Sequence, residues 1–173
     1  MEKKNIIIIK IGSSTLLTQR NRVDEFRIAH ILEQIAQLRQ EGYAIVLVVS
    51  GAVALGTQEI ALSSEKINRQ LAAGIGQVHL ISSFSAIAKS KHMHVSQMLL
   101  TRKDLLEIER REAIKILLLS YLERGILPIL NENDVVELNS FGGNDLLASR
   151  LAEIMRAQLV ILSTWEENRF GVG

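Results

Sequence analysis

Ile126-Leu127-Pro128-Ile129-Leu130 passes directly into Asn131-Glu132-Asn133-Asp134, and this stretch is typical of a short buried strand that ends at a binding site. Soon after it, Phe141-Gly142-Gly143 leads into a second polar pair, Asn144-Asp145. In parallel α/β sheets, ligands lie outside the carboxyl ends of the strands. Asn and Asp side chains there can bind an amine, a carboxylate or a metal-bound phosphate. The same residue types also form turns and cap helices, so either cluster alone is equally compatible with an ordinary polar loop.

The rest of the chain alternates short apolar runs with amphipathic stretches. Strands are expected over residues 6–11, 44–49, 95–100, 126–130 and 159–162. Helices are expected over residues 24–41, 51–60, 68–90, 111–123 and 145–157, the last with Asn144 or Asp145 as its N-cap. This order predicts a three-layer α/β sandwich with a mostly parallel central sheet and helices on both faces. Because no repeat or linker interrupts it, residues 1–173 are expected to form one domain.

Composition narrows the class of protein. Apolar residues make up 47% of the chain and charged residues 23%, as in a globular protein with a real core. The net charge of +1 and the 4% of aromatic residues argue against a nucleic-acid partner. No segment is expected to span a membrane. The absence of cysteine excludes disulfides and thiolate chemistry and suits a cytoplasmic protein.

Lys10 stands near the end of the first apolar run, where burial of an unpaired ammonium group would be costly. Gly12-Ser13-Ser14 follows it, and a turn of small residues lets backbone N–H groups approach a phosphate. Together they suggest a phosphoryl-binding corner. A lysine that reaches solvent from a strand end before an ordinary turn is the simpler alternative.

Ser50-Gly51-Ala52 joins the second expected strand to a helix. It places a hydroxyl and free N–H groups at a helix N-terminus, where a carboxylate binds well, although a serine N-cap has the same pattern. His92 and His94 are expected to alternate on one strand face, but without a third ligand they do not predict a metal site.

Six segments resemble the glutamate 5-kinases of the amino acid kinase superfamily, in the order and at about the spacing of that family. They are Lys10-Ile11-Gly12-Ser13-Ser14, Val48-Val49-Ser50-Gly51-Ala52-Val53, Leu71-Ala72-Ala73-Gly74-Ile75-Gly76-Gln77, Gln97-Met98-Leu99-Leu100-Thr101-Arg102-Lys103-Asp104, Pro128-Ile129-Leu130-Asn131-Glu132-Asn133-Asp134 and Phe141-Gly142-Gly143-Asn144-Asp145. The resemblance implies the carbamate kinase-like sandwich of the superfamily. It also implies transfer of a phosphoryl group from ATP, with Mg²⁺, to the γ-carboxylate of L-glutamate, the first step of proline biosynthesis.

The resemblance also implies roles for individual residues. Catalysis would fall to Lys10, which neutralises charge on the phosphoryl group, and to Asp145, which orients the catalytic lysine. The residues that would bind glutamate are Ser50, Gly51, Ala52, Asn131, Asp134 and Asn144. The residues that would bind ATP are Lys10, Gly12, Ser13, Ser14, Ser163 and Thr164. A homo-oligomer is implied, and L-proline is a candidate feedback inhibitor.

Two departures from the family pattern keep alternatives open. The family usually has Asp at the position of Gly143, and the stretch from Ser163 to Gly171 lacks the family's Thr-Asp pair. The family's nucleotide-binding half, with a second catalytic lysine, is expected to be missing from this chain. The alternatives are a non-catalytic protein that binds glutamate or proline, a partner of a full-length kinase subunit, and a kinase of the same superfamily that acts on aspartate or N-acetylglutamate.

Overall fold

A computed structural model describes residues 5–60 and 66–163. Its core is a five-stranded sheet in the order β3-β4-β2-β1-β5, in which every pair of neighbouring strands is parallel. The strands are β1 (Asn5–Ile11), β2 (Tyr43–Val49), β3 (His94–Leu100), β4 (Ile126–Glu132) and β5 (Leu159–Ser163). The helices are α1 (Ser13–Leu16), α2 (Glu25–Gln40), α3 (Ala52–Ile60), α4 (Lys66–Ser90), α5 (Arg102–Leu106), α6 (Ile108–Glu123) and α7 (Asn144–Met155). The predicted parallel α/β sheet is confirmed.

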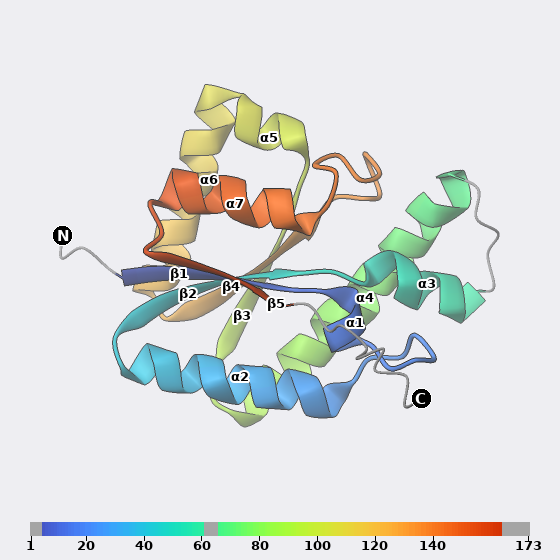
Figure 1. Cartoon of the computed structure of the whole chain (residues 1–173), viewed down its shortest axis with the longest axis horizontal. Coiled ribbons are helices and arrows are strands. Elements are labelled where there is room, and N and C mark those ends of the chain that lie inside the picture. Colours follow the sequence, from blue (N-terminus) through green and yellow to red (C-terminus); the bar gives the residue numbers. More distant parts are fainter. Residues whose placement is uncertain (1–4, 61–65, 164–173) are drawn as a thin grey trace, which may run out of the picture.

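Helices cover both faces of the sheet, with α2 and α4 on one side and α6 and α7 on the other (Figure 1). Successive side chains of a strand point to opposite faces. In β1, Ile7 and Ile9 therefore pack with α2 and α4, whereas Ile6 and Ile8 pack with α6 and α7. This alternation assigns Lys10, the next even-numbered residue, to the α7 face.

Helix α3 and the first half of α4 lie against each other beyond the carboxyl ends of the strands (Figure 1). Their backbones approach closely at two glycines. A Cβ atom built on Gly56 would lie 1.9 Å from the carbonyl oxygen of Ala72, and one on Gly76 would lie 1.7 Å from that of Ala52. Each glycine lowers helix stability by about 1 kcal/mol relative to alanine, and this close packing is the reason that the helices contain them.

Two short helices were not predicted, α1 and α5. They span four and five residues, too few to show a helical repeat of apolar side chains. In α5, the Asp104 carboxylate accepts hydrogen bonds from both the N–H and the hydroxyl of Thr101. The predicted N-cap of α7 was wrong, because Gly143 is the cap and Asn144 already begins the helix. This leaves the side chains of Asn144 and Asp145 free for other contacts.

One further expectation needs correction. His92 lies in a turn with φ 55° and His94 begins β3, so the two histidines do not share a strand face.

By length and mean hydropathy of 1.4, Ile67–Ser90 falls within the range of a membrane-spanning helix, which was not expected. Such a helix is weak support for a membrane span, since the core helix of a globular protein passes the same test. Leu80, Phe84 and Ala88 are fully buried in the core beside the sheet, as in such a core helix.

Candidate active site

The polar residues singled out in the sequence gather at the carboxyl edge of the sheet. Lys10 is level with Val48 of β2 and Leu162 of β5, and Val48 is level with Leu130 of β4. Asn131 therefore follows Leu130 directly and Ser50 lies two positions after Val48, both at the carboxyl ends of neighbouring strands. The parallel register thus brings together residues that are far apart in the sequence.

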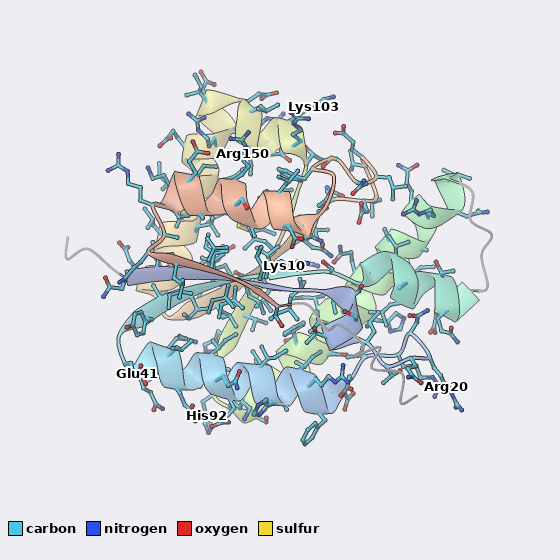
Figure 2. All side chains as sticks on the ribbon, in the orientation of Figure 1. Lys10, Arg20, Glu41, His92, Lys103 and Arg150 are labelled. Atoms are coloured by element: carbon cyan, nitrogen blue, oxygen red, sulfur yellow. The ribbon has the colours of Figure 1, made fainter. Side chains whose placement is uncertain are left out.

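Lys10 pairs with Asp145 at the start of α7. The distance from Nζ of Lys10 to Oδ1 of Asp145 is 2.8 Å, and the lysine side chain is 9% exposed whereas that of the aspartate is 56% exposed. Figure 2 shows Lys10 within the molecule, on the sheet below α7. The pair stabilises the buried ammonium group, because one partner carries the opposite charge and remains solvated. Lys10 is therefore held in place while its charge remains close to the open edge of the sheet.

A network of amide and hydroxyl groups lies beside this pair. The side-chain N–H₂ of Asn144 donates to Oγ of Ser50 and to Oδ1 of Asn131, each at 2.9 Å. The backbone N–H of Glu132 donates to Oδ1 of Asn131 at 2.9 Å and to Oδ1 of Asn144 at 3.3 Å. Three predicted substrate-binding residues from three different segments are thus connected in one rigid arrangement.

Glu132 is a residue of this site to which the sequence analysis gave no role. It is 3% exposed, and its Oε2 accepts the backbone N–H of Phe141 at 3.0 Å. Burial raises the pKa of Glu132, and the charge of Asp134 adds to this, whereas the backbone N–H groups of Phe141 and Gly143 oppose it. Glu132 thereby ties the end of β4 to the segment that leads into α7. A carboxylate just after a buried apolar run, at the point where the strand ends, is the sequence signal that could have found it.

Asp134 lies apart from the network in the loop that follows β4. It is partly buried, and its Oδ1 accepts the backbone N–H of Asn139 at 2.8 Å. Burial raises the pKa of Asp134, while that N–H and the charge of Arg69 lower it. Asp134 therefore shapes the loop at the open side of the site, and it makes no hydrogen bond to Asn131 or Asn144 within the described residues.

The turn after β1 lies beside Lys10. The N–H of Gly12 donates to the carbonyl of Ser163 at 3.1 Å, so Ser163 ties the end of β5 to this turn. Ser13 and Ser14 are exposed in the first turn of α1, and within residues 5–60 and 66–163 their N–H groups have no hydrogen-bond acceptor. Their open N–H groups can receive an anion. Thr164 lies outside the described residues.

The segment from Ser50 to Ala52 turns sharply from β2 into α3. Gly51 has φ 113°, a conformation that favours glycine. Ala52 is 1% exposed, and its backbone carbonyl lies against Gly76 in the α3–α4 contact. Ser50 presents its hydroxyl to Asn144 instead of capping α3.

Gly143 stands where the resemblance leads us to expect an aspartate. Its φ of 128° and ψ of 152° lie in a region that is essentially restricted to glycine. A Cβ atom on Gly143 would have no neighbour within 4 Å, so the backbone conformation, and not the space, demands glycine here. Within the described residues, no three His, Cys, Asp or Glu side chains are grouped to hold a metal ion.

Comparisons with known proteins agree with this geometry. The sequence pattern of the Amino acid kinase family matches residues 5–166. The glutamate 5-kinase of Clostridium acetobutylicum is 37% identical over 163 residues, which cover 91% of this chain and 61% of that protein. Glutamate 5-kinase 1 of Bacillus subtilis is 36% identical over 93% of this chain and 46% of its own length. For the glutamate 5-kinase of Syntrophus aciditrophicus the identity is 39%, over 91% of this chain and 43% of that protein.

The chain thus spans about half the length of the curated relatives that it matches. The family match covers nearly all of the described sheet, including the strand ends that carry Lys10, Ser50 and Asn131. The all-parallel sheet with helices on both faces is the fold expected from the resemblance. The chain belongs to the amino acid kinase family.

Proposed function

We propose that this chain binds L-glutamate and takes part in the ATP-dependent phosphorylation of its γ-carboxylate, the first step of proline biosynthesis. The network of Asn144 with Ser50 and Asn131 beside the Lys10–Asp145 pair supports the proposal most directly. It combines a neutral polar cradle for an amino acid with one positive charge at the point where a phosphoryl group would pass. The similar proteins named glutamate 5-kinase support the choice of substrate.

The cradle suits the charged ends of glutamate. Ser50, Asn131 and Asn144 supply hydroxyl and amide groups that can both donate and accept. The Asp134 carboxylate, on the loop beside them, suits the ammonium group of the amino acid. Ala52 is buried and can contribute only its backbone to glutamate binding. Gly51 forms the bend that orients Ser50 toward the site.

Transfer to a carboxylate requires little from the protein beyond position and charge. The γ-carboxylate of glutamate is ionised at neutral pH, so its oxygen can attack the γ-phosphorus of ATP without a general base. The bond from that phosphorus to the bridging oxygen breaks, and ADP leaves. Lys10 offsets the negative charge on the transferred group, and Asp145 holds Lys10 in position. Catalysis by positioning and charge is characteristic of phosphoryl transfer.

The turn after β1 fits the phosphates of ATP. Lys10 supplies a cation, Ser13 and Ser14 supply open N–H groups, and Gly12 and Ser163 hold the turn against β5. Mg²⁺ neutralises phosphate charge when bound, and the described residues suit an ion carried mainly by the nucleotide, since no group of three acidic or histidine ligands is present among them. We further propose a cytoplasmic homo-oligomer with L-proline as feedback inhibitor, as the resemblance implies.

The experiment that tests the proposal is hydroxylamine trapping of γ-glutamyl phosphate formed from ATP and glutamate by the purified chain. Calorimetry measures glutamate binding in parallel. Product above a glutamate-free blank would support the kinase, whereas binding without product would support a glutamate-binding protein that lacks turnover. If the chain neither bound glutamate nor formed product, the proposal would be refuted.

Substrate controls separate the related kinases of the family. Aspartate and N-acetylglutamate replace glutamate in the same assay, because each alters one end of the molecule and leaves a carboxylate to accept the phosphoryl group. Faster turnover of either would assign the chain to a different substrate. Asn144→Ala removes the residue that joins Ser50 to Asn131, and we expect it to abolish the heat of glutamate binding measured by calorimetry.

A further inference from the structure

A cleft on the outer side of α7 lies between that helix and the α5–α6 hairpin, away from the candidate active site. It encloses about 460 Å³, a size within the range of small-molecule sites, roughly 300–1,000 Å³. Five basic side chains line it: Arg102, Arg111, Lys115, Arg150 and Arg156. Figure 2 shows Arg150 on the side of α7 that faces away from the sheet. None of these residues was assigned a role in glutamate or ATP binding.

The cleft concentrates positive charge. Two carboxylates, Glu112 and Glu153, also line it, which leaves an excess of three positive charges in a chain whose net charge is +1. Among these five, and within residues 5–60 and 66–163, Arg150 alone has a carboxylate partner closer than 3.5 Å, Glu153 at 3.2 Å. Glu112 lies 3.9 Å from both Arg111 and Lys115, at the limit of an ion pair. Arg102 and Arg156 have no ion pair within the described part of the chain, so most of the cationic groups can receive an external anion.

An apolar surface lies within the same cleft. It is formed by Leu105, Phe141 and Leu146, together with Leu106 and Ile154. Phe141 is 7% exposed, whereas Leu146 is 55% exposed, so part of this surface faces solvent. Guanidinium groups around apolar side chains match a ligand with an anionic head and an apolar body.

We propose that this cleft binds a small organic phosphate. A guanidinium fork pairs with phosphate through two parallel hydrogen bonds. A phosphate monoester carries close to two negative charges at neutral pH, which suits the local excess better than a single carboxylate does. The apolar surface beneath the cations would contact the organic part, so inorganic phosphate should bind more weakly than a monoester.

The cleft shares a segment with the candidate active site. The backbone N–H of Phe141 donates to the Glu132 carboxylate of the candidate site, and Phe141 also lines the cleft. Leu146 lies in the first turn of α7, directly after Asn144 and Asp145. A ligand against Phe141 and Leu146 would stabilise the start of α7, and hence the position of the Asn144 amide. We therefore expect the phosphate ligand to change the affinity for glutamate, an effect that rests on the proposed function. By linkage, glutamate would change the affinity for the phosphate ligand by the same factor.

The test measures binding of phenyl phosphate to the full chain by calorimetry without glutamate, with inorganic phosphate and benzoate as comparisons. Phenyl phosphate is expected to bind at least about tenfold more tightly than either, because only it offers both parts of the ligand. In the double variant Arg102→Gln/Arg111→Gln, affinity should fall by roughly 100-fold, since each of the two lost charged hydrogen bonds costs about tenfold. Arg150→Gln, at an exposed position, is the second variant if the double variant does not fold.

Two control variants identify the location of binding. Arg20→Gln removes an arginine in the opposite part of the molecule (Figure 2) and should leave the affinity unchanged. Lys10→Ala removes the cation of the candidate active site and should also leave it unchanged. Loss of phenyl phosphate binding in Lys10→Ala but not in the cleft variants would overturn the proposal, as would no detectable binding to the unaltered chain. A chain that binds phenyl phosphate but not glutamate would refute the proposed function and leave the cleft assignment intact.

Discussion

Gly76 and Gly74 form a matched pair in α4, and alanine at these two positions should have opposite effects. A Cβ atom on Gly76 would lie 1.7 Å from the carbonyl oxygen of Ala52 and 2.9 Å from the backbone nitrogen of Gly56. A Cβ atom on Gly74 would lie 3.7 Å from Cγ2 of Val135, an ordinary contact. The two substitutions have the same chemistry and differ mainly in what the added methyl group meets.

The expected magnitudes follow from these distances. Alanine is favoured over glycine within a helix by about 1 kcal/mol, so Gly74→Ala should raise the free energy of unfolding by ~0.5–1 kcal/mol. In Gly76→Ala the same gain is outweighed. The clash is with backbone atoms, so α3 and α4 must separate by more than about 1 Å, and overpacking of this kind costs roughly 1–3 kcal/mol or more. We expect a net loss of ~1–2 kcal/mol.

The displacement in Gly76→Ala should also reach the candidate active site. Ala52 is the residue that the new methyl group would push, and it follows Ser50 and Gly51 at the start of α3. A shift there would lengthen the 2.9 Å hydrogen bond between Asn144 and Ser50. On the proposed function, glutamate affinity should therefore fall in Gly76→Ala and stay unchanged in Gly74→Ala.

Urea unfolding followed by circular dichroism gives both free energies, and calorimetry gives the two glutamate affinities. If Gly76→Ala were as stable as the unaltered chain, the close contact between α3 and α4 would not exist in solution. If Gly74→Ala were equally destabilising, the added methyl group would not be the cause, because it meets no close atom at that position.

Three further substitutions test other parts of the site. Lys10→Ala should lower transfer by roughly 10²–10³-fold, the loss of one charge-stabilising group, with the glutamate affinity from calorimetry nearly unchanged; intact turnover would refute its role. Glu132 has a raised pKa, so its contribution to stability is fully present below its unfolded pKa and is lost as pH rises through its folded pKa. The stability of Glu132→Gln relative to the unaltered chain should therefore increase with pH, and urea unfolding from pH 4 to 8 that showed a constant difference would contradict this. Gln77 is 5% exposed, and its Nε2 has no partner within the described residues. Gln77→Leu also removes the acceptor of Gln97 Nε2 at 3.2 Å, but Gln97 is exposed and its amide can bond to water instead. The melting temperature should therefore rise through a gain of ~1 kcal/mol, and a lower melting temperature would show that the Gln77 amide is satisfied in solution.

The central strands illustrate what local pattern can predict. The runs around Ile8, Val46 and Ile129 are apolar on both faces, so they could only be strands buried between helices, and the structure confirms this. The short helices α1 and α5 were missed because four or five residues show no periodicity. The N-cap of α7 was misplaced because Gly143 adopts a conformation that residue type alone does not reveal.

The candidate site also has some features that the local sequence pattern predicts and others that only the fold reveals. That Lys10 is unusual could be read from its position in an apolar run, but no local pattern pairs it with Asp145, 135 positions away. The family resemblance implied that Asp145 orients the lysine, and the structure joins the two side chains at 2.8 Å. Glu132 had no predicted role, because its role depends on the hydrogen bond that it accepts from the backbone N–H of Phe141, and only the folded chain places Phe141 beside the end of β4. Contacts of this kind depend on how the chain folds back on itself, which a local pattern does not encode.

The sequence by itself determined the alternation of strands and helices, the parallel sheet and the kinds of side chain at the strand ends. These properties follow from the spacing of apolar residues along the chain, which is local. Only the tertiary structure decided that Asn144 joins Ser50 to Asn131, that Gly76 sets the separation of α3 and α4, and that five basic residues from α5, α6 and the α7 region share one cleft. Distances between segments far apart in sequence arise from packing, because only a complete core fixes the positions of all its elements together.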